Sequence, residues 1–180
     1  QLLTFSRGGA PVKKTAMLGN IVRESTGFSL SGSNVKCRHY IDKDLWPCSV
    51  DSGQISQVIN NLVINADQAM PEGGAIGIRV ENVVVSSRDA LPLEEGKYVR
   101  VTVKDQGIGI SKQHISKIFD PYYTTKQKGS GLGLATCYSI VVRHGGHIAV
   151  ESEPGVGTSF HVYLPATSGR VRQKGNEKGK

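Results

Sequence analysis

The segment from Gln54 to Met70 constrains the fold most, because its residues separate into two stripes at helical spacing. One stripe is apolar and must be buried against a second layer: Ile55, Val58, Ile59, Leu62, Val63, Ala66 and Ala69. The other stripe consists of neutral amides: Gln54, Gln57, Asn61, Asn65 and Gln68. The segment is therefore expected to be an amphipathic helix, with Asp51 as a capping start.

Strand patterns surround this helix. Alternation of apolar and polar residues predicts strands at Ala75–Val85 and Tyr98–Lys104, and a closing hairpin of Ile148–Ser152 with Thr158–Leu164 around E-P-G-V-G. Two short strands are expected on either side of the polar turn 42–44, and further helices at 15–27 and 132–144. These elements predict an α+β fold: a two-layer α/β sandwich whose mixed, mostly antiparallel sheet is covered on one face by helices.

The net charge of +7 does not indicate a nucleic-acid-binding protein. From Gly169 onward five lysines and arginines face one glutamate, which is +4 of that total, and the remainder is spread thinly. We therefore expect no nucleic-acid partner and read 167–180 as a basic linker or tail. Three cysteines without metal-type spacing favour a reducing cytoplasm, and a Cys37–Cys48 disulfide is the alternative. No apolar run is long enough for a membrane span, so direct membrane contact is not expected.

The chain starts without a methionine, which suggests a piece of a longer protein. Residues 1–9 read as the end of a helix that stops at Gly8-Gly9, with its partner helix upstream. Residues 10–166 are expected to form one domain.

Asp105 follows a predicted strand and directly precedes Gly107 and Gly109. Glycines at this spacing allow a tight backbone path against which a ligand can lie. A carboxylate there can accept a hydrogen bond from an exocyclic amine such as that of adenine, and it discriminates against the carbonyl of guanine. The alternative is an Asp-initiated turn whose carboxylate caps its own backbone.

Gly129, Gly131 and Gly133 lead into the helix predicted at 132–144, and the free N–H groups of a helix start favour phosphate. The spacing is neither a Rossmann fingerprint nor a P-loop. Before these glycines, aromatic residues alternate with threonines and lysines in F-D-P-Y-Y-T-T-K, which suits a lid over a nucleotide. An ordinary surface loop and a glycine-rich turn without a ligand are the alternatives.

Neutral amides on the 54–70 helix fit such a ligand, since an amide offers a carbonyl to a hard cation and an N–H to phosphate. Magnesium prefers oxygen ligands and commonly keeps phosphates in its shell, so Asn65 or Asn61 is a candidate ligand. A solvent-exposed face that happens to be amide-rich is the alternative.

Four segments together resemble the N box, first glycine box, F box and second glycine box of sensor histidine kinases: Gln57–Ala69, Asp105–Ile110, Phe119–Lys126 and Gly129–Leu134. The resemblance covers roughly residues 10–165. It implies the Bergerat-type fold shared with gyrase, mismatch-repair and heat-shock chaperone ATPases, and within it the nitrogen-regulation-like or hybrid sensor kinases.

The resemblance also implies roles for single residues. Asn65 would hold Mg²⁺, Asp105 would bind the adenine amine of ATP, and Thr158 would join that contact through water. Gly131–Leu134 would lie along the phosphates, and Lys126 or Lys128 would reach the terminal one. The full implied nucleotide-binding set is Asn61, Asn65, Asp105, Gly107, Gly109, Ile110, Phe119, Tyr123, Thr124, Thr125, Lys126, Gly129, Ser130, Gly131, Leu132, Gly133, Leu134 and Thr158, with Asn61 and Lys126 as the catalytic residues.

Two departures from the resembled pattern shape the expected mechanism. ATP-hydrolysing relatives carry a glutamate one helical turn before the magnesium asparagine, whereas Asn61 here cannot take a proton at neutral pH. The family's phosphorylated histidine is followed by an acidic residue, and none of the five histidines here is. We therefore expect phosphoryl transfer to a histidine on an upstream dimerisation domain, in a homodimer that passes the group to a response regulator receiver domain.

Two alternatives use the same fold. One is a nucleotide-gated module or anti-sigma-type kinase that phosphorylates serine in a separate partner. The other is an ATP-driven clamp like the chaperones, which Asn61 disfavours.

Overall fold

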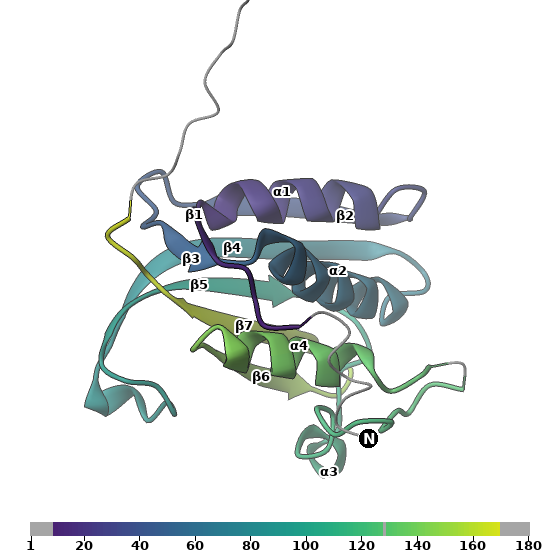
Figure 1. The fold of residues 1–180 in the computed structure, drawn as a ribbon. Helices are drawn as coiled ribbons and strands as arrows, with labels where there is room; N and C mark the ends of the chain where they lie inside the picture. Colours follow the sequence, from purple (N-terminus) through teal and green to yellow (C-terminus); the bar gives the residue numbers. More distant parts are fainter. Residues whose placement is uncertain (1–8, 128, 170–180) are drawn as a thin grey trace, which may run out of the picture.

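A five-stranded mixed sheet forms one layer of the molecule, and three helices form the other (Figure 1). The computed structural model describes residues 9–127 and 129–169. The sheet has the strand order β2-β4-β5-β7-β6, and β1 pairs with β3 in a separate two-stranded sheet. The elements are β1 (Lys14–Ala16), α1 (Leu18–Ser29), β2 (Val35–Ile41), β3 (Cys48–Val50), α2 (Ser52–Gln68), β4 (Gly74–Val85), the 3-10 helix η2 (Ser87–Asp89), β5 (Gly96–Lys104), α3 (Lys112–Ile115), α4 (Gly133–Arg143), β6 (His147–Glu153) and β7 (Gly157–Pro165).

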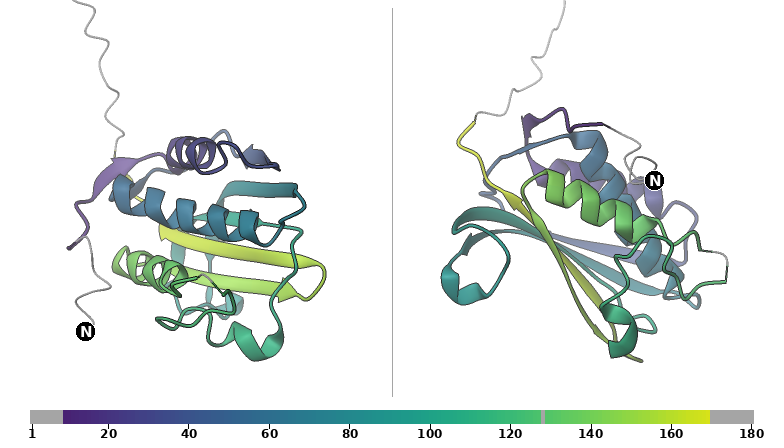
Figure 2. Two further views of the ribbon diagram at one scale, coloured as in Figure 1. Left: turned by 90° about the vertical axis from the view of Figure 1, so that its right-hand side faces the viewer. Right: turned by 60° about the horizontal axis from the view of Figure 1, so that its bottom comes forward.

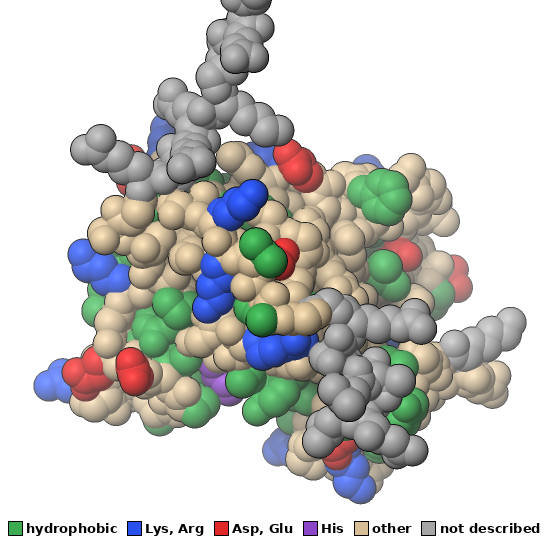
Figure 3. All heavy atoms as spheres, in the orientation of Figure 1, with side chains coloured by type: hydrophobic (Ala, Val, Ile, Leu, Met, Phe, Trp, Pro, Cys, Tyr) green, Lys and Arg blue, Asp and Glu red, His purple; other side chains and the backbone are tan. Residues whose placement is uncertain are grey.

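Helices α1, α2 and α4 lie side by side on one face of the sheet, with α2 in the middle (Figures 1 and 2). The core lies between the layers, where Val58 and Leu62 of α2 meet strand residues such as Ile78 and Phe160. The α+β sandwich predicted from the sequence is thus confirmed. On the helix face, basic and acidic side chains are interspersed with uncharged atoms (Figure 3).

Helix α2 agrees with its sequence pattern from end to end. Asp51 adopts the extended backbone of an N-cap, and its Oδ1 accepts the Gln54 N–H at 3.2 Å. All its buried residues belong to the predicted apolar stripe. The amide stripe is consequently left on the side of the helix that faces α4 and the segment before it.

The start of the domain differs from the expectation. Residues 14–16 form strand β1 rather than the beginning of a helix, and α1 starts at Leu18. The two short strands expected around 42–44 both exist, but they do not pair with each other. β2 runs parallel to β4, whereas β3 pairs antiparallel with β1. The expected helix at 1–9 lies outside the described residues except for Gly9.

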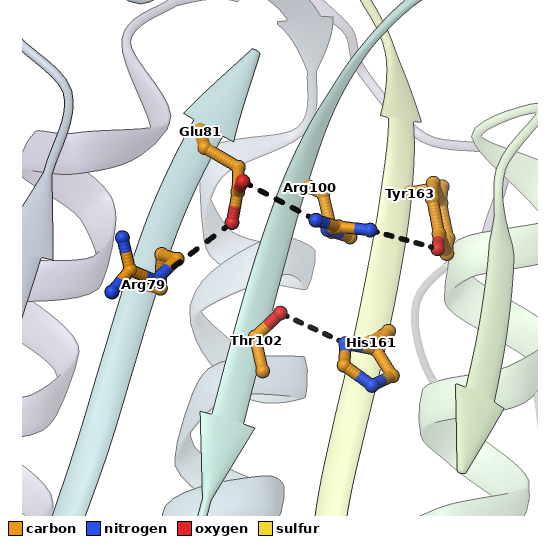
Figure 4. Close-up of polar contacts among 6 residues, drawn as sticks. All are labelled: Arg79, Glu81, Arg100, Thr102, His161 and Tyr163. Atoms are coloured by element: carbon orange, nitrogen blue, oxygen red, sulfur yellow. Dashed lines mark hydrogen bonds and ion pairs between the residues drawn. The ribbon is translucent and has the colours of Figure 1, made fainter. Parts of the chain in front are cut away.

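The outer face of the sheet is polar, and several of its side chains pair laterally across three strands (Figure 4). Glu81 on β4 lies 3.2 Å from an Arg100 nitrogen on β5 and 4.0 Å from Arg79 Nε. Arg100 in turn donates to Tyr163 Oη at 3.4 Å. These partly exposed ion pairs contribute at most about 1 kcal/mol each, so the sheet is stabilised mainly from its helix-covered side.

His144 joins the C-terminal end of α4 to the start of α2. It is 2% exposed, its Nε2 accepts the Asp51 N–H at 3.1 Å, and its Nδ1–H donates to the Ile140 carbonyl at 2.8 Å. The Nε2 contact requires the neutral imidazole, because a protonated Nε2 cannot accept a hydrogen bond, and burial lowers the pKa of His144 below its usual 6.5.

A pH-dependent stability follows from this pair of contacts. Unfolding allows His144 to protonate, so its contribution is fully present above about pH 6.5 and is lost as the pH falls toward the lower pKa of the folded state. We expect His144→Gln to lower the free energy of unfolding at pH 8 by about 1–3 kcal/mol, and to flatten its decline between pH 7.5 and pH 5.5. Urea unfolding across that range measures both. An unchanged slope in the variant would contradict the assignment.

Candidate functional site

The Asp105 carboxylate lies at the end of β5, where it is held by two backbone groups. Its Oδ1 accepts the N–H of Gly107 at 2.9 Å and that of Thr158 at 3.2 Å. The residue is 4% exposed, and burial raises the pKa of the carboxyl while the two N–H groups oppose that rise. The self-capping turn considered from the sequence is therefore present, but it uses only one oxygen. Within the described residues Oδ2 receives no hydrogen bond and is left for a ligand.

Gly109 allows two turns of the chain to approach each other beside Asp105. Its φ is +73°, and a Cβ at this position would collide with the Glu153 carbonyl. The neighbouring Ile108 bonds to both sides: its N–H donates to the Ala69 carbonyl at 3.2 Å, and its carbonyl accepts the Gly155 N–H at 2.8 Å. The Asp105 turn is thereby fastened to the C-terminal end of α2.

Ser152 is a site residue that the sequence reasoning missed. Its Oγ accepts the Ile110 N–H at 2.7 Å, donates to the Gly157 carbonyl at 3.0 Å and lies 2.8 Å from Thr158 Oγ1. It therefore links the glycine turn to Thr158, which is the residue expected beside the base. Alternation in the β6–β7 hairpin does not reveal this role, because many strand serines have no such partner.

The amide stripe of α2 faces the second half of the site. Asn61 Nδ2 donates to the Gly133 carbonyl at 3.2 Å. One turn later, Lys126 Nζ donates to Asn65 Oδ1 at 2.8 Å and to Gln68 Oε1 at 2.6 Å. Burial lowers the pKa of Lys126. Asn61, expected to be catalytic, therefore lies on the same face of α2 as Asn65, the expected metal ligand. The Lys126 ammonium, also expected to be catalytic, contacts that face from the segment before α4.

Helix α4 begins beside Asn61 with free backbone donors. Leu132 is its N-cap and supplies no side-chain hydrogen bond, so the first N–H groups of the helix have no side-chain partner there. Gly131 has a φ of +70°, and a Cβ there would collide with the Tyr122 backbone, whose N–H donates to the Gly131 carbonyl at 3.0 Å. This arrangement can receive phosphate oxygens, as the glycine spacing predicts.

The segment before α4 is anchored at two points beside the site. Phe119 packs on Tyr138 and Phe160, with ring centroids 5.8 and 6.3 Å away. The second point is the Tyr122–Gly131 contact. The Tyr123 hydroxyl bonds to His114 Nδ1, a partner that the sequence reasoning did not identify.

The remaining residues expected at the nucleotide site differ in their contacts. Thr124 Oγ1 accepts the Lys126 N–H, and the Gly129 N–H donates to the Lys126 carbonyl, so these residues form a turn. Ser130 Oγ accepts the Leu132 N–H, whereas Leu134 packs against the core. Thr125 is exposed and has no hydrogen bond among the described residues.

The donor set near Asn65 fits a hard cation. Two amide oxygens already converge on one positive group, the Lys126 ammonium, and such neutral oxygen donors suit Mg²⁺ when phosphates complete its shell. Over the described ranges there is no cluster of three His, Cys, Asp or Glu residues that could hold a metal without phosphate.

Comparison with known proteins agrees with this geometry. Residues 50–168 match the family of histidine kinase-, DNA gyrase B- and HSP90-like ATPases. The chain belongs to this family. The match spans α2, the Asp105 turn, the α4 start and the closing hairpin, which are the elements that build the site.

The similar members of this ATPase family are sensor kinases. The chain is 39% identical over 92% of its length to the sensor kinase CckA of Brucella abortus, and 36% identical over 81% to sporulation kinase E of Bacillus subtilis. It spans 18% of the length of each. The solved catalytic domain of histidine kinase ThkA is 30% identical, with a TM-score of 0.71 over 86% of this chain and 95% of that one. The chain is thus a histidine-kinase-type ATP-binding catalytic domain. In the part that the structure describes, no helix is both long and apolar enough to cross a membrane.

Proposed function

We propose that this domain transfers the γ-phosphoryl group of ATP to a histidine on a separate helical domain that precedes it in the full protein. The observation that carries the proposal is the identity and hydrogen bonding of Asn61. It lies one turn before Asn65, and its amide is already bonded to the Gly133 carbonyl at the start of α4. An amide cannot accept a proton from water at neutral pH, so this position offers no general base for hydrolysis.

Four groups would bind the nucleotide. The free Oδ2 of Asp105 would accept the adenine amine, with Thr158 beside it, and the uncapped N–H groups of α4 would hold phosphate oxygens. Asn65 would hold Mg²⁺, which when bound neutralises phosphate charge. Lys126 would stabilise the terminal phosphate during transfer, and Phe119 anchors the segment that carries it.

The wider setting follows from the sensor kinases that the chain resembles. We infer a homodimer of the full protein, a receiver domain of a response regulator as the next acceptor, and a cytoplasmic position for this domain. No contact with nucleic acid or membrane is part of the proposal.

The test supplies the acceptor as a separate polypeptide. This chain with radiolabelled ATP should neither label itself nor hydrolyse ATP appreciably, because an in-line nucleophile and a group to orient it are lacking. Adding the helical domain encoded upstream should produce a label on that domain that is labile in acid and stable in base, as a phosphoramidate is. The rate should be far below that of the joined protein, since effective concentration is lost.

The same experiment separates the alternatives. A label that is stable in acid and labile in base indicates a serine acceptor and the anti-sigma type of kinase. Rapid ATP hydrolysis by this chain alone, unaffected by the added domain, would overturn the kinase assignment in favour of an ATP-driven clamp.

A further inference from the structure

Lys126 does more in this structure than approach a phosphate position. Its Nζ donates to Asn65 Oδ1 at 2.8 Å and to Gln68 Oε1 at 2.6 Å. The two acceptors lie three residues apart on α2, so their oxygens converge on one point. Asn65 is also the residue proposed to hold Mg²⁺. The ammonium and the metal therefore compete for the same oxygen.

The charge of this ammonium is held only by neutral groups. None of the ion pairs found in the described part of the chain involves Lys126. A bound polyphosphate offers full negative charges, so Lys126 gains a stronger partner when it leaves the two amides.

The backbone around Lys126 forms a turn. The Lys126 N–H donates to Thr124 Oγ1 at 3.0 Å, and its carbonyl accepts the Gly129 N–H at 3.4 Å. This turn lies beyond Phe119, which is fixed in the core, and before the Gly131–Tyr122 contact. The hydrogen bonds from Lys126 to α2 therefore also keep the Thr124–Lys126 turn against the site.

We propose that the Lys126 ammonium, tethered to α2 by these hydrogen bonds, takes the place of the metal ion until nucleotide binds. This proposal rests on the nucleotide site proposed above. Without nucleotide its ammonium occupies the cation position at Asn65 and Gln68 and closes the segment over α2. Metal-bound nucleotide displaces it, and only a nucleotide with a γ-phosphate gives it a new partner. The contact thus makes the site favour the triphosphate over the diphosphate.

The test compares two nucleotides on Lys126→Met, which keeps the length of the side chain and removes its charge and donors. Calorimetry with Mg·ADP should show roughly three- to tenfold tighter binding than wild type, because no tether must be broken. Mg·AMPPNP should gain less or bind more weakly, because its γ-phosphate loses a partner. Lys126→Arg should restore most of the wild-type preference.

Gln68→Ala separates the tether from the phosphate contact. It removes one acceptor of the tether and leaves Lys126 available, so both Mg·ADP and Mg·AMPPNP should bind more tightly. Lys117→Met is the matched control, since Lys117 is an exposed lysine of the same segment whose side chain forms no hydrogen bond or ion pair among the described residues. It should change neither affinity.

Hydrogen exchange without nucleotide gives an independent readout. Lys126→Met and Gln68→Ala should each increase exchange in residues 120–127, while Lys117→Met should not. Unchanged exchange in both variants, or unchanged Mg·ADP affinity of Lys126→Met, would refute the tether even if wild type binds nucleotide normally. If wild type bound no adenine nucleotide, the proposed function would fail instead, and the exchange result would still decide whether the tether exists.

Discussion

Asp105→Asn is expected to weaken the binding of adenine nucleotides by more than tenfold. The carboxylate Oδ1 is occupied by the Gly107 and Thr158 N–H groups, so Oδ2 is the atom that faces a ligand. In the variant the amide carbonyl keeps the two backbone bonds and turns its NH₂ toward the adenine amine, so a donor faces a donor. A hydrogen bond to a charged group contributes about 1.5–3 kcal/mol, which corresponds to about tenfold or more in affinity.

Base selectivity makes this prediction specific. Wild type should bind ATP and not GTP in calorimetry, because the guanine carbonyl would face the carboxylate. The variant should lose most of that discrimination while its melting temperature stays near that of wild type. Asp42→Asn, a change to an exposed carboxylate in the loop after β2, serves as the control and should alter neither property. Unchanged ATP affinity in a folded Asp105→Asn protein would exclude the residue from base recognition.

Asn65→Ala is expected to abolish the magnesium dependence of ATP binding. Its Oδ1 is the oxygen proposed to serve the metal, whereas the groups proposed for the base are Asp105 and Thr158 on other elements. Calorimetry with and without Mg²⁺ should therefore show the same weakened affinity for ATP in the variant. Adenosine, which carries no phosphate, should bind as it does to wild type.

The control for Asn65→Ala comes from the same stripe of amides. Gln57 is exposed and its side chain forms no hydrogen bond among the described residues, so Gln57→Ala should preserve the response to Mg²⁺. A parallel loss of adenosine affinity in Asn65→Ala would mean that the residue shapes the pocket rather than binding a metal.

Local periodicity was sufficient to predict the central elements. Helix α2, strands β4 and β5 and the β6–β7 hairpin each repeat a pattern over seven residues or more, which exceeds chance alternation. Strands β1 and β3 have three residues each, too few for a period. The parallel β2–β4 pairing joins segments separated by a helix, so the sequence around 42–44 predicted two strands but not their partners.

In the candidate site, too, features set by local sequence could be predicted and features set by long-range contacts could not. Asp105 and the glycines around it could be identified because their residue types and spacing follow from backbone requirements. The roles of Ser152 and Gln68 depend on partners far away in the sequence, Ile110 and Lys126 respectively. Such pairings arise from the packing of layers, and a single sequence carries no local signal for them.

Helix α2 also connects the site to residues 9–12, at the start of the described chain. At its first turn, Asp51 Oδ2 accepts the Val12 N–H, and Gln54 Nε2 donates to the Gly9 carbonyl. Beyond its other end, the Ala69 carbonyl holds the Asp105 turn through Ile108. A helix of 17 residues is about 25 Å long and resists bending. The segment at 9–12 and the Asp105 turn thus lie at opposite ends of one stiff helix, so a rotation imposed on that segment would be transmitted along α2 to the Asp105 turn.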